Sequence, residues 1–293
     1  TDTDTDTDTD DEDTDTDDED PGGGGTNTPT IPPGTGWTGP TAEPGQVGSG
    51  PHDDAKVIAR WDVVPYQSFT DTFQVGIPAF HINQVDRVEF AVEGGPWVAA
   101  DSMAYNPRTD VWEYYGVLRA SDFTSAGPIE VRAIAYPIVG MPRLLNSLYL
   151  NVDPDDSMPS DVRYVSPTGS DTTGDGSSSA PFATIKNAAQ DLTNELGAAD
   201  GCTIYLTAGD HNYGGGWPYM PTVNDRYLTI TPAPGLTKDD VRVTSYSGSL
   251  RAKLVHVKDL TFRTYFTAGP SENAHIWVDD CHMIGNGPET RID

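Results

Sequence analysis

The side chains of this chain that could take part in chemistry are concentrated at its amino-terminal end. The first twenty residues, TDTDTDTDTDDEDTDTDDED, hold thirteen carboxylates and seven threonine hydroxyls. Threonine-rich tracts are candidates for O-glycosylation. The sequence therefore predicts covalent glycans on seven side chains, Thr1, Thr3, Thr5, Thr7, Thr9, Thr14 and Thr16.

The same repeat also predicts contacts beyond its own residues. In an extended strand the alternation places the hydroxyls on one face and the carboxylates on the other. A segment without apolar side chains cannot offset the entropy of fixing its backbone. Sugars on the hydroxyls, calcium between the carboxylates, or neighbouring copies of the protein could order it. A solvated acidic stalk that holds the rest of the chain away from a cell surface is the remaining alternative.

A second candidate metal site lies in the stretch GSDTTGDGS, residues 169–177. Asp171 and Asp175 offer the oxygen ligands that calcium prefers, and Gly174 and Gly176 permit a tight turn. The spacing is not that of a helix-loop-helix calcium loop. Asx-turns explain the same residues without a metal, so calcium is a candidate cofactor and both interpretations stay open.

The two cysteines, Cys202 and Cys281, lie too far apart in the sequence for a zinc motif. They either form one disulfide or remain two buried thiols.

Charged residues also gather near the carboxyl-terminal end, where Asp279, Asp280 and His282 follow Lys253, Lys258 and Arg263. Adjacent strand residues point to opposite faces, so Asp279 and Asp280 do not form a pair by themselves. A solvated outer face accounts for all of them. The sequence therefore predicts no catalytic residue and no enzyme.

The overall charge limits the kinds of partner. The net charge is −28, and the 273 residues after the repeat still hold 32 acidic against 17 basic residues. Such a chain repels nucleic acid and anionic membrane surfaces. It also lacks an apolar run long enough to span a membrane as a helix.

Composition divides the chain into four parts. Residues 1–20 are the acidic repeat, and residues 21–52 form a linker rich in Gly, Pro and Thr. Trp37 in this linker is either an exposed residue or an anchor for self-association, because one Trp buries much area at a single point. Residues 53–155 and 160–293 read as two β-rich domains.

Residues 53–155 show the pattern of an antiparallel β-sandwich, because short β-branched or aromatic runs alternate with Gly, Pro, Asn and Asp. Val57, Ala59 and Trp61 are expected on one face, and VEFAVEGGPWVAA reads as a hairpin around Gly94 and Gly95. Together with YNPRTDVWEYYGVL and GPIEVRAIAYP, this layout resembles an immunoglobulin-like module of bacterial extracellular proteins. The resemblance implies a spacer or adhesive module.

The stretch RYVSPTGSDTTGDGSSSAPFATIKNAAQDLT combines a strand, a Gly-rich loop and an apolar helix face opening near Pro181. That helix face comprises Phe182, Ile185, Ala188, Ala189 and Leu192. With the strand GCTIYLTAG that follows, the stretch resembles the start of right-handed parallel β-helix proteins of the pectate-lyase-like superfamily. The resemblance implies an amphipathic helix that caps the first coil, followed by coils of about 15–25 residues. Few coils fit before Asp293, so more are expected beyond it.

The predicted fold class is therefore all-β, an immunoglobulin-like sandwich followed by the start of a right-handed parallel β-helix. The predicted function is that of an extracellular or cell-surface bacterial structural protein, a fibre subunit that assembles with copies of itself. A secreted polysaccharide-active β-helix enzyme on an acidic stalk and a carbohydrate-binding surface adhesin are the alternatives.

Overall fold

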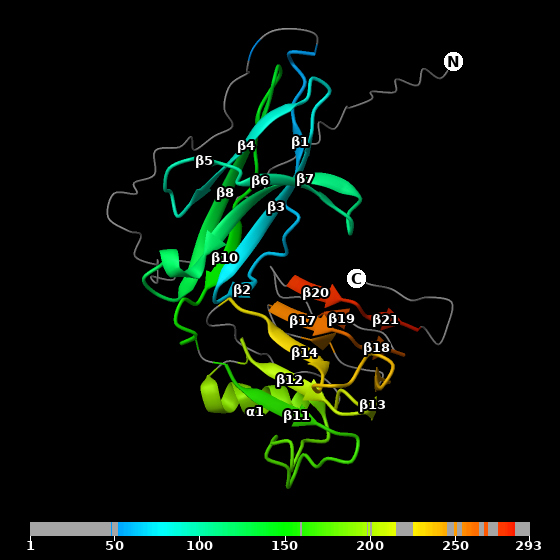
Figure 1. Cartoon of the computed structure of the whole chain (residues 1–293). Helices are drawn as coiled ribbons and strands as arrows, with labels where there is room; N and C mark the ends of the chain where they lie inside the picture. The colour runs from blue at the N-terminus through cyan, green and yellow to red at the C-terminus, as the bar shows by residue number, and fades with distance from the viewer. Residues whose placement is uncertain are drawn as a thin grey trace, which may run out of the picture.

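The computed structural model describes Gly48 and residues 52–158, 160–197, 199, 201–214, 225–244, 249–250, 254–263, 267–268 and 275–284. Strands dominate this part of the chain (Figure 1). They form two facing sheets in the first half and three parallel sheets in the second half.

The first half is a β-sandwich. One sheet has the order β1 (Ile58–Ala59), β3 (Thr72–Phe80), β7 (Val111–Arg119) and β6 (Ser102–Asn106). The other has the order β2 (Ser68–Phe69), β10 (Leu148–Val152), β8 (Gly127–Pro137), β4 (Val85–Val92) and β5 (Val98–Ala99), with β9 (Arg143–Leu144) paired to β8. A short 3-10 helix, η1 (Ala120–Asp122), follows β7. All pairs are antiparallel except β2 with β10.

Alternation along the strands builds the sandwich core. Val75 and Ile77 of β3 are fully buried and pack with residues of the opposite sheet. Val57 is buried in the same core and Ala59 and Trp61 pack against it, whereas Ile58 is 71% exposed. The predicted common face of Val57, Ala59 and Trp61 is therefore confirmed.

The predicted hairpin is also present, with its turn displaced by one residue. Strand β4 pairs with β5 through Glu89 with Ala99 and Phe90 with Val98. The left-handed residues of the turn are Glu93 and Gly94, with φ of 50° and 69°. Gly94 meets this requirement at little cost, because it has no Cβ.

In the second half the chain passes repeatedly from one parallel sheet to another. The first sheet consists of β11 (Val162–Val165), β12 (Thr203–Leu206), β14 (Leu228–Pro232), β17 (Leu254–Lys258) and β20 (His275–Asp279). The second consists of β13 (Gly209–His211), β15 (Val241–Val243), β18 (Thr261–Phe262) and β21 (His282–Met283), and β16 (Ser249–Leu250) pairs with β19 (Thr267–Ala268). Every pairing among these strands is parallel.

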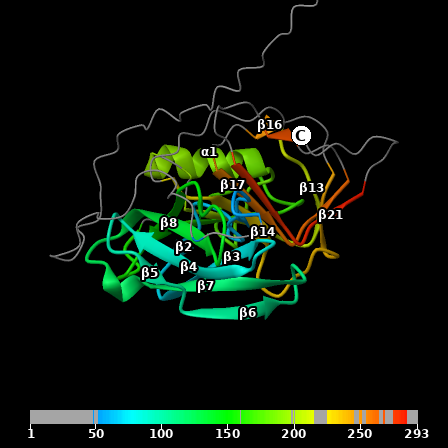
Figure 2. The ribbon, with the colours of Figure 1, turned by 90° about the horizontal axis from the view of Figure 1, so that it is seen from above.

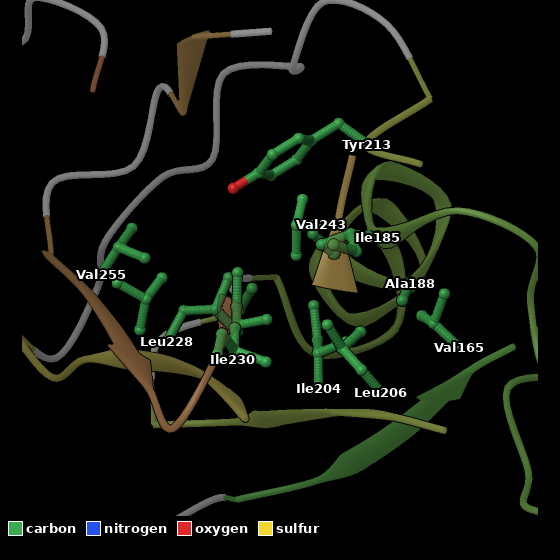
Figure 3. Close-up of a cluster of buried hydrophobic side chains, with 14 of the residues drawn as sticks. Val165, Ile185, Ala188, Ile204, Leu206, Tyr213, Leu228, Ile230, Val243 and Val255 are labelled. Atoms are coloured by element: carbon green, nitrogen blue, oxygen red, sulfur yellow. The ribbon is translucent and has the colours of Figure 1, made fainter. Parts of the chain in front are cut away.

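The helix α1 (Ile185–Leu196) packs against the core between these sheets. Its buried face consists of Ile185, Ala188, Ala189 and Leu192. In Figure 3 this face lies over the side chains of Ile204 and Leu206 from β12, with Val243 of β15 alongside. The apolar face predicted for the helix is therefore the buried one.

The predicted start of the helix near Pro181 is wrong by about one turn. Phe182 exchanges backbone hydrogen bonds with the strand β11, donating to the Tyr164 carbonyl at 3.0 Å and accepting from the Ser166 N–H at 2.9 Å. Thr184 is the N-cap, and its side chain accepts from the Asn187 N–H. Phe182 thus packs into the core from an extended segment.

The two halves are in direct contact. The buried Asn151 of β10 donates through Nδ2 to the Tyr66 carbonyl at 3.1 Å and to the Asp225 carbonyl at 2.9 Å. The rings of Tyr66 and His275 lie 5.3 Å apart. Viewed from above, β6 and β7 of the sandwich lie on one side of the molecule and α1 on the other (Figure 2).

None of the helices within the described ranges is long and apolar enough to cross a membrane.

Candidate functional site

A pocket of about 470 Å³ opens where the sandwich meets strand β20, and we call it the groove. The sandwich contributes one wall, from the chain between β1 and β2, from β3, and from the turn between β6 and β7. Strand β20 contributes the other. The lining residues are Asp62, Val63, Val64, Gln67, Phe73, Gln74, Asn106, Arg108, Thr109, Trp277 and Asp279.

Alternation along β20 determines which of its side chains reach the groove. Ile276 packs against the core of the parallel sheets. Trp277 and Asp279 therefore both face outward, because successive strand residues point to opposite sides. Lysine, amide and carboxylate groups surround them, so this outer face combines an aromatic surface with polar side chains.

Trp277 is held by an aromatic stack. Its register partner on β17 is His256, and the two rings are stacked with centroids 3.8 Å apart and planes 10° from parallel. The ring of Tyr227 meets Trp277 edge-on at 5.8 Å. The indole is thus fixed by two neighbours, so it offers a surface that needs little ordering on contact.

His256 also lies behind Asp279. Its Nε2 is buried and 3.8 Å from the Asp279 Oδ2, and the Lys258 ammonium is 3.9 Å from the same oxygen. Burial lowers the pKa of His256 to about 4, and the Asp279 carboxylate only partly opposes this. The imidazole is therefore neutral at neutral pH.

The sandwich wall is organised by one buried carboxylate, Glu113 of β7, which is fully buried. Its Oε1 accepts hydrogen bonds from the Asn106 Nδ2 at 3.0 Å and from the Thr109 hydroxyl at 2.6 Å. The same Asn106 Nδ2 lies 3.2 Å from the Asp62 Oδ2. Gly76 leaves the space for this side chain, because a Cβ there would lie 2.8 Å from the Glu113 Oε2.

Asp62 has an altered proton affinity in this setting. Burial, and after it the negative charge of Glu113, raise the pKa of the Asp62 carboxyl above its usual value, while Arg60 and Arg108 act in the opposite direction. The Asp62 carboxyl in the groove wall therefore takes up a proton more readily than an aspartate free in solution does.

The groove combines one aromatic surface with hydrogen-bond donors and acceptors on both walls. The amides of Gln67 and Gln74 offer both kinds of group. Such a mixture suits a ligand whose own groups both donate and accept, and an apolar ring face on that ligand would stack on Trp277.

A second feature of the surface is apolar. An open furrow of about 480 Å³ lies along β1, the end of β3 and the start of β7. It is lined by Ile58, Ala59, Arg60, Pro78, Ala79, Phe80, Asp110, Val111 and Trp112. Phe80 is 65% exposed and Trp112 58%. Exposed apolar groups of this size, when they cluster, are typical of contact surfaces.

Several of the predicted site residues lie outside the described residues. These are the seven threonines of the repeat, Thr1, Thr3, Thr5, Thr7, Thr9, Thr14 and Thr16, together with Trp37 and Lys253. Their predicted roles in glycosylation, self-association and surface charge stay predictions.

The two aspartates predicted to bind calcium are engaged with the backbone. The Asp171 carboxylate accepts from the backbone N–H groups of Ala183 and Thr184 at 2.9 and 3.0 Å and from the Thr184 hydroxyl at 2.8 Å. Asp175 accepts from the Ser177 N–H at 2.9 Å, which is an Asx-turn. Within the described part of the chain, no three His, Cys, Asp or Glu side chains are grouped as a metal would require. Calcium binding here remains a prediction.

Of the two alternatives for the cysteines, the structure has separate thiols rather than a disulfide between Cys202 and Cys281. Cys202 is buried in the core of the parallel sheets. Cys281 donates to the Asp279 carbonyl at 3.3 Å, and burial raises the pKa of its thiol.

The charged residues near the carboxyl-terminal end separate in space. Asp279 lines the groove beside Lys258, whereas Asp280 lies in the turn after β20 and pairs with Lys238. His282 and Arg263 are exposed. The interpretation of Asp279 as part of a solvated outer face is thus incomplete, because Asp279 also lines a pocket together with side chains of the sandwich.

Sequence reasoning did not select Asp62, Asn106, Arg108, Glu113 or Trp277. A signal existed for Trp277, because the alternation in AHIWVDDCH places it on the same face as Asp279. None existed for the sandwich residues, whose partner strand lies more than 160 residues further along the chain.

Comparison with known proteins identifies no relative. No family model matches the chain, and no curated protein matches it. Among solved structures it is similar to "Structures of Clostridium thermocellum CbhA fibronectin(III)-like modules", with 15% identity and a TM-score of 0.23. The similarity covers 33% of this chain and 47% of that one, so the chain spans about half of that structure's length.

Proposed function

We propose that this protein is an extracellular carbohydrate-binding protein whose groove holds an oligosaccharide segment. The observation that carries the proposal is the joint lining of one pocket by Trp277 and Asp279 of β20 and by the polar side chains of the sandwich. The proposed role is binding rather than catalysis.

The chemistry of the lining supports this class of ligand. Sugar hydroxyls both donate and accept hydrogen bonds, as the amides and carboxylates of the groove require. The C–H face of a pyranose ring stacks on an indole, and Trp277 is already fixed by His256 and Tyr227. A nucleic acid would be repelled by a chain of net charge −28.

The experiment is calorimetric titration with a panel of neutral hexasaccharides that includes cellohexaose, xylohexaose and maltohexaose. We expect at least one to bind, and Trp277→Ala to weaken that binding at least tenfold, because the stacking surface is removed. Trp112→Ala is the matched control, since Trp112 is exposed in the apolar furrow and does not line the groove. No binding by the whole panel, or equal effects of the two substitutions, would contradict the proposal.

The location and the amino-terminal repeat belong to the same proposal. A bacterial cell surface would suit a binding protein that is held at a distance by an acidic Thr-Asp stalk with O-linked glycans. Mass spectrometry of the first fifty residues tests this, because unmodified threonines throughout would remove the glycan part. Calcium, the candidate cofactor, is tested by thermal unfolding with calcium and with a chelator.

We further propose that the parallel sheets are the first coils of a right-handed parallel β-helix capped by α1, and that the sandwich is immunoglobulin-like. The repeated passage of the chain between three parallel sheets supports the β-helix assignment. The burial of α1 in the core that those strands share also supports it. An experimental structure of a longer chain would test both parts.

A fibre subunit is the second candidate function. The apolar furrow with Ile58, Phe80 and Trp112 favours it, since such surfaces are commonly covered by another protein. Sedimentation at increasing concentration tests self-association, and Phe80→Ser should lower it. A monomer at all concentrations would leave only the binding function.

A further inference from the structure

The sheet that supplies β20 to the groove also carries two tyrosines on its outer face. On β12, Ile204 and Leu206 are fully buried and lie beneath α1 in Figure 3, so Tyr205 between them points to the opposite side. On β11, Val165 lies in the same core, so Tyr164 points outward as well. Both tyrosines are partly exposed.

The strand register places these tyrosines in one row with the groove residue Asp279. Tyr164 pairs with Tyr205, and Tyr205 pairs with Thr231 of β14. At the other end of the row, Lys258 of β17 pairs with Asp279. The pairing of β14 with β17 ends at the residues just before Thr231 and Lys258, which places these two beside each other. Neighbouring strands lie about 4.8 Å apart, so the row spans about 19 Å from Tyr164 to Asp279.

A second row on the same face ends at Trp277. It consists of Thr203, Thr229, His256 and Trp277, each of which pairs with the next. Thr203 and Thr229 are partly exposed, so their hydroxyls lie between the groove and the two tyrosines. The outer face therefore has an aromatic surface at each end and hydroxyl groups between them.

The two tyrosine rings lie close enough to act as one surface. Their centroids are 5.4 Å apart and their planes are tilted by 42°. The backbone pairing of β11 with β12 fixes the positions from which they project, so little ordering is needed on contact. The charges within the row offset each other, because the Lys258 ammonium lies 3.9 Å from the Asp279 Oδ2. A neutral ligand with ring faces and hydroxyls suits this combination.

We infer that the oligosaccharide held in the groove continues across the outer face of the first parallel sheet and stacks on a second site formed by Tyr164 and Tyr205. The inference rests on the proposed function, because it extends the ligand that the groove holds. The ligand is a neutral, extended sugar chain, whose middle units hydrogen-bond to the hydroxyls of Thr229 and Thr231. A short oligosaccharide fills the groove alone, whereas a longer one reaches both aromatic surfaces.

The first experiment measures how affinity depends on the length of the sugar. Calorimetry on the full chain compares cellohexaose with cellotriose and xylohexaose with xylotriose. We expect the hexasaccharide of at least one series to bind about tenfold more tightly than its trisaccharide, because only the longer sugar reaches the tyrosines.

The variant Tyr205→Thr tests the second site, and it introduces the residue type that β14 has in the same row, Thr231. We expect it to remove most of the advantage of the hexasaccharide and to leave the affinity for the trisaccharide unchanged. Trp277→Ala should weaken the binding of both lengths. Tyr105→Thr is the matched control, because Tyr105 is an exposed tyrosine of β6 that lines neither the groove nor the row, and it should behave as the wild type.

The outcomes separate the second site from the groove. Binding that depends on Trp277 but is the same in Tyr205→Thr and the wild type would uphold the proposed function and overturn the inference. Hexasaccharide binding that is lost in Tyr205→Thr but kept in Trp277→Ala would uphold the tyrosine site and overturn the groove. Binding of no hexasaccharide, maltohexaose included, would overturn both.

A second experiment covers the case in which Tyr205→Thr does not fold. Carbon-13 NMR follows labelled tyrosine rings in the wild-type chain, with signals assigned through Tyr164→Phe and Tyr205→Phe. We expect the ring signals of Tyr164 and Tyr205 to shift when the hexasaccharide is added and to stay in place with the trisaccharide. Equal shifts with both lengths, or shifts with neither, would overturn the inference.

Discussion

Each wall of the groove has an ionisable side chain behind it that the ligand would not reach. Glu113 lies behind Asp62, Asn106 and Thr109, and His256 lies behind Trp277 and Asp279. Burial keeps His256 neutral, and a neutral imidazole can stack closely on an indole without the cost of a buried charge.

His256 makes the stability of the protein depend on pH in a defined window. The pKa of His256 is about 4 in the folded state and about 6.5 in the unfolded chain. The unfolded state therefore binds the proton first as the pH falls, and the folded state loses stability between pH 6.5 and pH 4. The loss attributable to this group is on the order of 3 kcal/mol by pH 4.

The substitution His256→Gln removes this contribution. We expect the variant to be less stable than the wild type at pH 7, because the stack with Trp277 is lost, but to lose less stability between pH 7 and pH 4. Urea unfolding at pH 7, 5.5 and 4 measures both values. Parallel declines in the two proteins would contradict the assignment.

At the scale of elements, α1 packs one apolar face into the core that the parallel strands share. Its face of Ile185, Ala188, Ala189 and Leu192 is buried, and Gly197 ends it in the left-handed conformation with φ 82°. The last residue, Leu196, is 42% exposed. The helix therefore has one buried leucine, Leu192, and one exposed leucine, Leu196.

We expect Leu192→Ala to destabilise the protein by about 2–5 kcal/mol, because it leaves a cavity in the core beneath the helix. Leu196→Ala is the matched control and should cost less than about 1 kcal/mol. Thermal and urea unfolding measure both. Equal effects would mean that the helix does not cover the core as described.

The sequence predicted these elements to different degrees. The strands of the sandwich, the hairpin after Val92 and the buried face of α1 followed from alternation and helical spacing, which are local properties. The start of α1 did not, because Phe182 continues the apolar pattern although its backbone hydrogen bonds to the Tyr164 carbonyl and from the Ser166 N–H hold it extended. The calcium interpretation of Asp171 missed the backbone N–H groups that it accepts from.

The groove could not be predicted from local pattern. Asp62 and Asn106 come from the sandwich and Trp277 from the last described strand of the first parallel sheet, so nothing in their own neighbourhood indicates that they meet. Glu113 in VWEYYGVL reads as an ordinary exposed strand residue. Its burial depends on Gly76, Asn106 and Thr109, which are neighbours only after the strands pair.

At the scale of the whole molecule, the groove depends on how the two halves are joined. Asn151 is fully buried at the junction and bridges the carbonyls of Tyr66 and Asp225. A second contact, from the Arg226 Nε to the Ser68 hydroxyl, is longer at 3.4 Å. The first contact should therefore contribute more to holding the walls at a fixed separation.

We expect Asn151→Ala to destabilise the protein by about 1–3 kcal/mol, because two partly buried carbonyls lose their donor. Hydrogen exchange should quicken around Tyr66 and Asp225, and sugar binding should weaken while each half remains folded. Ser68→Ala is the control, with a smaller effect on all three measurements. Unchanged exchange at the junction in Asn151→Ala would show that other contacts hold the halves together.

The order in which the chain is made gives β20 a particular significance. The sandwich wall is complete once residue 152 has left the ribosome, but its counterpart arrives only with Trp277, after the preceding parallel strands have stacked in turn. A nascent or proteolytically shortened protein therefore has half a groove, however well its sandwich has folded. Retention on immobilised oligosaccharide would then act as a quality check, selecting molecules whose later strands have assembled in the correct order.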